Sequence, residues 1–294
     1  MRAPRVSVHA RAAAPISAGD RHVTDHRDWT GKVGSIWAQE WRRTDRSFIE
    51  LTPRLLAAIE AEPFRHALDI GCGAGETSCA LAKAHPDRSI TGVDIAPDLL
   101  DVARERGSAF ANLAFVEGDA ATTAFDFAPD ALVSRHGVMF FADPVAAFAH
   151  LHAVAAPSAR LTFSCFRKRA ENEWVGATLA ALPDPPSPPL DPFEPGPFAF
   201  GERDRVATIL RDAGWRDIAF DAVDYRMIFG AGADPIADAC DYLTRVGPTA
   251  TPIAALAPSA RQATLERMAQ RLETYLAADR IAMPAAAWIV TARA

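Results

Sequence analysis

A glycine-rich turn at residues 71–75 is the part of the sequence whose residue types point most directly to chemistry. It follows an apolar run, residues 66–70, that predicts a buried strand, and it leads into a predicted helix that begins at Glu76. Glycine has no Cβ and tolerates positive φ, so a ligand can approach the backbone of such a turn closely. Asp94 ends the next predicted strand about 20 residues later, where a carboxylate can accept both hydroxyls of a ribose. The pattern predicts a site for a ribose-containing ligand.

Two other interpretations of this turn are open from its residues. A GxGxG sequence alone is also compatible with a tight turn that binds nothing. A nicotinamide dinucleotide site would share the strand, the turn and the later acid, but Glu76 stands where its third glycine belongs. A pyrophosphate also needs an unobstructed helix N-terminus, whereas an acidic site suits a ligand that carries an ammonium group. The residues therefore disfavour NAD.

Three segments carry a resemblance to a known family. In this order and spacing, LDIGCGAGE (68–76), GVDIAPDLLDVAR (92–104) and VEGDA (116–120) resemble the first three motifs of class I S-adenosylmethionine-dependent methyltransferases. The resemblance covers roughly residues 63–170. It implies a Rossmann-like fold, S-adenosylmethionine as the cofactor, and transfer of its methyl group to a small molecule.

The resemblance also implies roles for individual residues. Asp69, Gly71 and Gly73 would line the amino-acid part of the cofactor, and Asp94 would bind its ribose. The set that it implies for the cofactor comprises Asp69, Gly71, Cys72, Gly73, Gly75, Asp94, Ile95, Asp119, Ala120 and Arg135.

The adenine end of the cofactor is expected at the third motif. Ile95 would flank the adenine, while Asp119 and the backbone of Ala120 would hydrogen-bond its edge. The alternative for Asp119 is a turn residue after the third strand, because aspartate is common in turns. Arg135 has two further alternatives, since an arginine there could bind an acidic acceptor or pair with an acid of the fold.

Methyl transfer from a sulfonium is an in-line displacement in which the protein mainly aligns the nucleophile and excludes water. A general base helps where the acceptor must lose a proton. His136 is the predicted base, because it follows the fourth strand at the edge of the sheet where ligands bind in open α/β folds. The alternative is a histidine that packs or hydrogen-bonds locally.

Aromatic residues offer a wall for the acceptor. Trp37 and Trp41, one helical turn apart, could close over the sulfonium or stack on an aromatic acceptor, and core packing is their alternative use. Phe140 and Trp174 follow the fourth and fifth strands, a position that favours an apolar substrate pocket over simple core filling. The predicted acceptor is a small apolar or aromatic metabolite that reacts through oxygen, nitrogen or carbon.

Charge and motifs argue against several other functions. The net charge is −6 and long basic runs are missing, which disfavours nucleic acid as a partner. Ser134-Arg135-His136-Gly137 stands where nucleobase and amide methyltransferases often carry an Asn/Asp-Pro-Pro-aromatic sequence. No His/Asp/Glu cluster has convincing metal spacing, and no apolar run is long enough to span a membrane. A cofactor-binding module without catalysis and a nucleic-acid methyltransferase remain the alternatives.

The scattered cysteines fit a reducing cytoplasm, and a homodimer stays open. Alternating strands and helices, with two late strands at residues 218–228 and 286–293, predict a doubly wound, mostly parallel seven-stranded α/β sheet. The proline-rich segment, with eight prolines in residues 183–197, could be a lid or a stiff spacer. The predicted organisation is a mobile tail (1–28), a helical cap (29–62), the cofactor-binding core (63–170), a proline-rich lid or insertion (171–203), a core helix and strand (204–230), a helical insertion (231–280) and a final strand (281–294).

Overall fold

A computed structural model describes residues 26–187 and 191–294 of the chain. Residues 1–25 of the predicted tail (1–28) lie outside the described residues. The first helix, α1 (His26–Trp29), starts inside that predicted tail. Within the described ranges, no helix is both long and apolar enough to cross a membrane.

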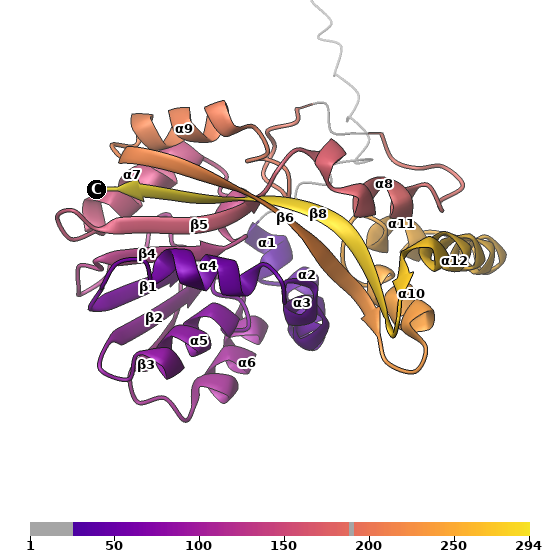
Figure 1. Cartoon of the computed structure of the whole chain (residues 1–294), viewed down its shortest axis with the longest axis horizontal. Helices are drawn as coiled ribbons and strands as arrows, with labels where there is room; N and C mark the ends of the chain where they lie inside the picture. The colour runs from indigo at the N-terminus through magenta and orange to yellow at the C-terminus, as the bar shows by residue number, and fades with distance from the viewer. Residues whose placement is uncertain (1–25, 188–190) are drawn as a thin grey trace, which may run out of the picture.

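A single mixed sheet organises the chain (Figure 1). Five strands run parallel, β8 lies antiparallel between β5 and β6, and a two-residue strand, β7, pairs with β8 beside the main sheet. The predicted fold class, a doubly wound and mostly parallel sheet, is confirmed. The order across the sheet is β3 (Leu113–Glu117), β2 (Ser89–Asp94), β1 (His66–Ile70), β4 (Ala131–Arg135), β5 (Arg160–Phe166), β8 (Arg280–Arg293) and β6 (Arg216–Ala231).

The central strands are buried on both faces because helices cover the sheet from both sides. β1, β4 and β5 are almost continuously buried, as expected for parallel strands between helical layers. The helices α4 (Thr52–Ile59), α5 (Glu76–Ala84) and α6 (Pro97–Gly107) contact one another in sequence, whereas α7 (Pro144–Val154) packs with α9 (Arg203–Asp212). Figure 1 shows α7 and α9 together, away from α4 and α5.

Local sequence explains where several of these helices begin. Proline stands in the first turn of α4, α6 and α7, where it lacks only an amide hydrogen that the helix would leave unpaired. Asp143 caps α7 by accepting a hydrogen bond from the amide of Ala146 at 3.0 Å. The helix predicted to begin at Glu76 is α5, which ends at Ala84.

The N-terminal cap consists of α2 (Lys32–Gln39), α3 (Trp41–Ser47) and α4. Helix α2 packs on α6 and α3 packs on β6, so the cap joins α6 to the edge strand of the sheet. The Ser47 hydroxyl donates to the carbonyl of Ile228 at 3.0 Å, and Arg46 donates to the carbonyl of Phe229 at 2.8 Å. These bonds fix the cap against one edge of the sheet.

The strands β6 and β8 continue past the sheet as a curved ribbon (Figure 1). Helices α10 (Pro235–Leu243), α11 (Ala250–Ala254) and α12 (Pro258–Leu272) lie at its far end, where α12 also contacts α8 (Glu173–Leu179). An apolar stripe at helical spacing runs over residues 258–279, yet α12 ends at Leu272. After α12 and a 3₁₀ turn, Leu276 pairs with Ile281 in a tight hairpin whose turn contains Ala278 at φ +54°. Pairing with β8 therefore overrides helix propensity there.

Asn172 joins the end of β5 to β8 and α8. It is 1% exposed, and its amide nitrogen donates to the carbonyls of Lys168 at 3.1 Å and Ala286 at 3.2 Å. Its amide oxygen accepts from the N–H of Ala286 at 3.0 Å and from Nε1 of Trp174 at 3.3 Å. A single buried side chain thus satisfies backbone groups of two segments.

Replacing Asn172 with Ala is expected to lower the free energy of unfolding by about 3 kcal/mol, because it leaves several buried donors and acceptors unpaired. Urea denaturation at neutral pH measures this change. Gln262→Ala, which removes an exposed amide from α12, is the control and should change stability by less than about 0.5 kcal/mol. A loss of similar size in both variants would contradict the bridging role of Asn172.

Candidate functional site

The turn after β1 has an unusual backbone conformation. Gly71, Gly73 and Gly75 all have positive φ values, of +60°, +53° and +78°. Residues with a Cβ rarely adopt this conformation, so the three glycines are required by the backbone path itself. A Cβ built on Gly73 would meet no atom within 4 Å. The backbone therefore borders open space at Gly73, as the predicted ligand approach requires.

The turn after β4 lies directly against this glycine turn. A Cβ on Gly71 would lie 3.0 Å from Cα of Gly137, so the two backbones are in contact. The Ser134 hydroxyl donates to the carbonyl of Ile70 at 2.7 Å and accepts from the amide of Gly137 at 3.2 Å. Along the chain, β2 and β3 are added on one side of β1, and β4 is then added on the other side of β1. This switch point is where ligands bind in open α/β sheets.

Asp94 ends β2 beside the glycine turn. Its Oδ2 accepts from the amide of Gly73 at 2.8 Å, and its Oδ1 accepts from the amide of Ala96 at 2.9 Å. Burial raises the pKa of the carboxyl group. Each carboxylate oxygen has a second lone pair for a ligand hydroxyl. Asp94 thus holds the turn in place, and half-buried Ile95 follows it at the same edge.

Asp69 lies beneath the turn. It is 1% exposed and accepts a hydrogen bond from the hydroxyl of Ser78, on α5, at 2.6 Å. Burial raises the pKa of this carboxyl group to about 7, even though the hydroxyl of Ser78 acts in the opposite direction. Its role in lining the cofactor stays a prediction, because the structure shows this side chain directed at α5. Cys72 is half-buried, and a Cβ on Gly92 would lie 2.8 Å from its sulfur.

The third motif forms a local turn. The Asp119 carboxylate accepts from the amide of Ala121 at 2.9 Å, and its backbone carbonyl accepts from the amide of Thr122 at 2.9 Å. This geometry agrees with the turn alternative for Asp119. Ala120 is buried, and the neighbouring Gly118 donates its amide to the carbonyl of Asp94 at 2.9 Å. The structure therefore brings the second and third motifs together.

Arg135 is engaged by acids of the fold. Its guanidinium forms ion pairs with Glu76, at the start of α5, and with Asp45 of the cap at 3.2 Å. It also donates to the hydroxyl of Thr52 at 3.1 Å and lies 5.0 Å from the ring centre of Phe48. Arg135 could bind an acidic acceptor or pair with an acid of the fold, and the structure agrees with the second alternative. Direct contact between Arg135 and the cofactor stays a prediction.

The predicted tryptophan pair is separated, which corrects the expectation of one helix. Helix α2 ends at Gln39, so Trp37 and Trp41 belong to different helices. Trp41 lies beneath Arg106, whose guanidinium is 4.0 Å from the ring centre and donates to the carbonyl of Ala74 at 2.7 Å. Because the helix breaks at Glu40, the two indoles have different partners: Trp37 packs near Trp29, and Trp41 near Arg106.

Trp37 and Phe140 meet through a third aromatic residue. The ring centre of Trp29 lies 5.7 Å from that of Trp37 and 5.2 Å from that of Phe140. These three side chains join the cap to the 3₁₀ turn after β4, which spans Val138–Phe140. The sequence pattern did not predict Trp29 as their link.

His136 sits in a strained position at the end of β4. It has φ +62°, which is uncommon for a residue with a Cβ and is frequent at functional sites. Its amide donates to the carbonyl of Ser164 at 3.0 Å, and its Nδ1 lies 2.8 Å from the hydroxyl of Ser164. The side chain is buried, and Nε2 has no hydrogen-bond partner among the described residues. Burial, reinforced by the nearby Arg135, lowers the pKa of the imidazole to about 3.

Aromatic rings pack against this imidazole, and further rings continue the contact toward α8 and β6. The ring centres of Phe48 and Phe166 lie 5.0 and 4.3 Å from that of His136, and Trp174 lies 5.7 Å from Phe166. We call this group the aromatic cluster; its members are Phe48, His136, Phe166, Trp174, Phe198 and Phe229. His136 and Trp174, predicted from different strand ends, thus belong to one assembly.

Some residues of this site were missed from the sequence. Ser164 lies inside a buried strand, where nothing in the local pattern marks a hydroxyl that faces His136. Gly137 carried a signal, because a glycine directly after a strand end is typical of close backbone approach. Within the described ranges, no group of His, Cys, Asp or Glu side chains could hold a metal ion.

Comparisons with known proteins agree with this geometry. Residues 67–158 match the family described as "Methyltransferase domain". The trans-aconitate 2-methyltransferase of Methylobacterium radiotolerans is 34% identical over 103 residues, which are 35% of this chain and 38% of that protein. The demethylmenaquinone methyltransferase of Deinococcus radiodurans is 29% identical over 177 residues, which are 55% of this chain and 73% of that protein. The chain thus spans well under half the length of the first relative.

Solved structures share the fold at low sequence identity. A putative methyltransferase from Bacillus halodurans has a TM-score of 0.52 and 15% identity, covering 83% of this chain and 98% of that one. Haemonchus contortus phosphoethanolamine N-methyltransferase 2, solved with S-adenosyl-L-methionine, has a TM-score of 0.53 and 16% identity. The match covers 92% of this chain and 60% of that one.

The family match and the fold both indicate a methyltransferase. The matched residues run from β1 to the end of α7 and contain the glycine turn, Asp94 and His136. The antiparallel β8 between β5 and β6 completes the sheet. Residues 67–158 therefore resemble the methyltransferase domain family, and the fold of the chain is that of the Rossmann-like methyltransferases.

Proposed function

We propose that this chain binds S-adenosylmethionine at the glycine turn and transfers its methyl group to a small molecule. The observation that carries the proposal is the left-handed Gly71–Gly75 turn, held by Asp94 and open at Gly73. The cofactor supplies a methyl group that its sulfonium has already activated. The chain's own residues have to hold the cofactor and align the acceptor.

The residues present fit such a cofactor. A ribose carries two adjacent hydroxyls, and the two oxygens of Asp94 each offer a lone pair next to the open face of the turn. Glu76, at the start of α5, and Asp69, which is partly ionised at neutral pH because its pKa is about 7, supply negative charge for an ammonium group nearby. Arg135 limits the charge of Glu76 by pairing with it.

His136 is proposed to position the acceptor. Its low pKa keeps the imidazole neutral near pH 7, so Nε2 can accept a hydrogen bond when Nδ1–H donates to the hydroxyl of Ser164. In this role it orients a hydroxyl or amine of the acceptor and weakens its bond to the proton. Phe48 and Phe166 beside it favour an apolar or aromatic acceptor.

Replacing Asp94 with Ala or Asn is expected to weaken binding of S-adenosylhomocysteine about 100-fold or more, because bonds from two hydroxyls to a charged group are lost. Isothermal titration calorimetry measures the affinity. Asp101→Ala, on the exposed face of α6, is the control and should bind as wild type does. Asp94→Asn keeps the size of the side chain, and thermal unfolding shows whether its turn is intact. Wild-type affinity in a folded Asp94→Asn protein would contradict the proposed site.

His136 should make stability depend on pH in a defined direction. Its pKa is lower in the folded protein than in the unfolded chain, so the unfolded chain binds more protons below about pH 6.5 and folding weakens as the pH falls. From pH 6.5 to 5 this amounts to about 2 kcal/mol in wild type. His136→Asn, whose new residue tolerates positive φ, should lose that dependence.

Urea denaturation at several pH values, with wild type and His136→Asn side by side, tests this dependence. Imidazole NMR signals give a second readout, and the signal missing from His136→Asn should keep a constant shift from pH 5 to 8 in wild type. A titration of that signal in this range would show that His136 is not the neutral acceptor proposed here.

A further inference from the structure

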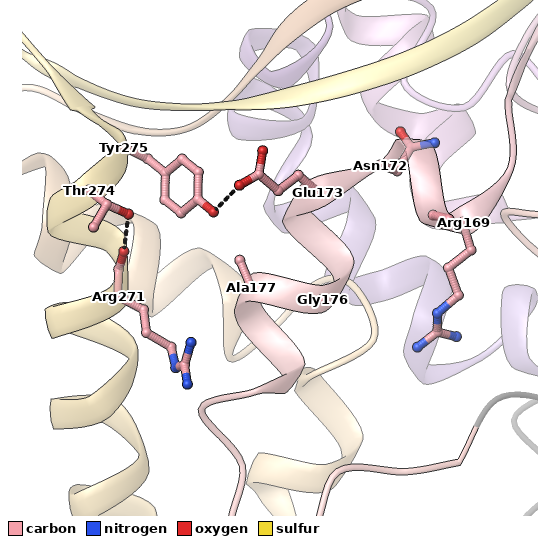
Figure 2. Close-up of a pocket in the computed structure, with 9 residues that line it drawn as sticks. Arg169, Asn172, Glu173, Gly176, Ala177, Arg271, Thr274 and Tyr275 are labelled. Atoms are coloured by element: carbon pink, nitrogen blue, oxygen red, sulfur yellow. Dashed lines mark hydrogen bonds between the residues drawn. The ribbon is translucent and has the colours of Figure 1, made fainter.

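A cavity of about 710 Å³ opens between α8 and the end of α12 (Figure 2). One wall comes from the segment after β5, which includes the 3₁₀ turn Arg169–Glu171 and the first turns of α8. The other wall comes from Arg271, Thr274 and Tyr275. This volume lies in the range of small-molecule sites.

This cavity is separate from the aromatic cluster, because α8 stands between them. Trp174 and Val175 are buried in the core, whereas Glu173, Gly176 and Ala177 on the same helix line the cavity. A Cβ on Gly176 would meet no atom within 4 Å, so the surface of the helix is open there. The cavity therefore lies on the opposite face of α8 from the proposed methyl-transfer site.

The two walls are tied together by hydrogen bonds. The Tyr275 hydroxyl donates to Oε1 of Glu173 at 2.6 Å, a contact that Figure 2 shows across the cavity. Near the same helices, Nε of Arg267 donates to the carbonyl of Ala181 at 2.9 Å. These bonds join α8 to α12, so the space between them is preformed.

Two arginines give the cavity its charge. In Figure 2 Arg169, from the turn before α8, and Arg271, from the end of α12, lie on either side of α8. In the part of the chain that the structure describes, neither guanidinium has an ion pair or a hydrogen bond. Burial lowers the pKa of Arg169, whereas Arg271 is exposed. A half-buried cation without a partner costs free energy that a bound anion would recover.

The remaining polar groups do not cancel this charge. Glu173 is the carboxylate of the lining, and its Oε1 already accepts from Tyr275. Together with burial, this carboxylate raises the pKa of the Tyr275 hydroxyl to about 12, so the hydroxyl stays a neutral donor. Two guanidinium groups and one carboxylate leave the lining positive in a chain whose net charge is −6.

We propose that this cavity is a second binding site, which takes a small acidic molecule whose carboxylate or phosphate groups pair with Arg169 at one end and Arg271 at the other. The planar guanidinium fork matches the oxygens of both groups and forms paired hydrogen bonds with them. The apolar surface of Ala177 and the open side of Gly176 leave room for the carbon skeleton of the ligand. The site uses no residue of the glycine turn.

Calorimetric titration with citrate and, separately, with inorganic phosphate tests this site in the full chain. Wild type should bind at least one probe, and raising NaCl from 50 to 300 mM should weaken the binding. Arg169→Gln and Arg271→Gln should each weaken it at least 10-fold. Tighter binding of citrate would identify a carboxylate ligand, and tighter binding of phosphate would identify a phosphate ligand.

Arg261→Gln is the matched control, since it removes an arginine from the same helix, α12, without touching the cavity. It should bind the probes within twofold of wild type. Affinity for S-adenosylhomocysteine should be the same in all these proteins, which separates this test from that of the glycine turn. Absence of binding of both probes to wild type, or an equal loss in Arg261→Gln, would overturn the proposal.

Discussion

The contact between the turns after β1 and β4 is the constraint on which the site depends. A Cβ on Gly71 would lie only 3.0 Å from Cα of Gly137. The Ser134 hydroxyl forms hydrogen bonds with both turns. Because the backbones touch, the end of β1 and the end of β4 form one continuous edge. The residue next to this contact, His136, then takes a left-handed conformation that few side chains adopt.

Charge links the cap to that edge. Asp45 of α3 pairs with Arg135 of β4 and with Arg106 of α6, and Arg106 also holds the carbonyl of Ala74. Arg135 in turn pairs with Glu76. A half-buried network of this kind is worth more than separate surface ion pairs, because each group satisfies several partners away from bulk water. The position of the cap and the shape of the glycine turn are therefore coupled.

The sequence predicted well what local rules control. A glycine turn between an apolar run and a helix predicted both β1 and the start of α5, and the five parallel strands follow from short apolar runs. It predicted poorly what tertiary contacts control. Trp37 and Trp41 have helical spacing, yet a break at Glu40 separates them. Ser164 faces His136 only because β4 and β5 are neighbours, and Glu173 meets Tyr275 across 102 residues of sequence.

The position of β8 in the middle of the sheet has a consequence for the order of assembly. Among the described residues β6 pairs with β8 alone, and β8 also pairs along β5, so Arg160 lies opposite Arg293. The half of the sheet around β1 can form from nearby segments, whereas β6 stays an unpaired strand until β8 arrives. Such distant pairing requires closure of long loops and slows folding. During that interval the ribbon edge is open to strands of other chains, so the slow step of folding is also the step most exposed to aggregation.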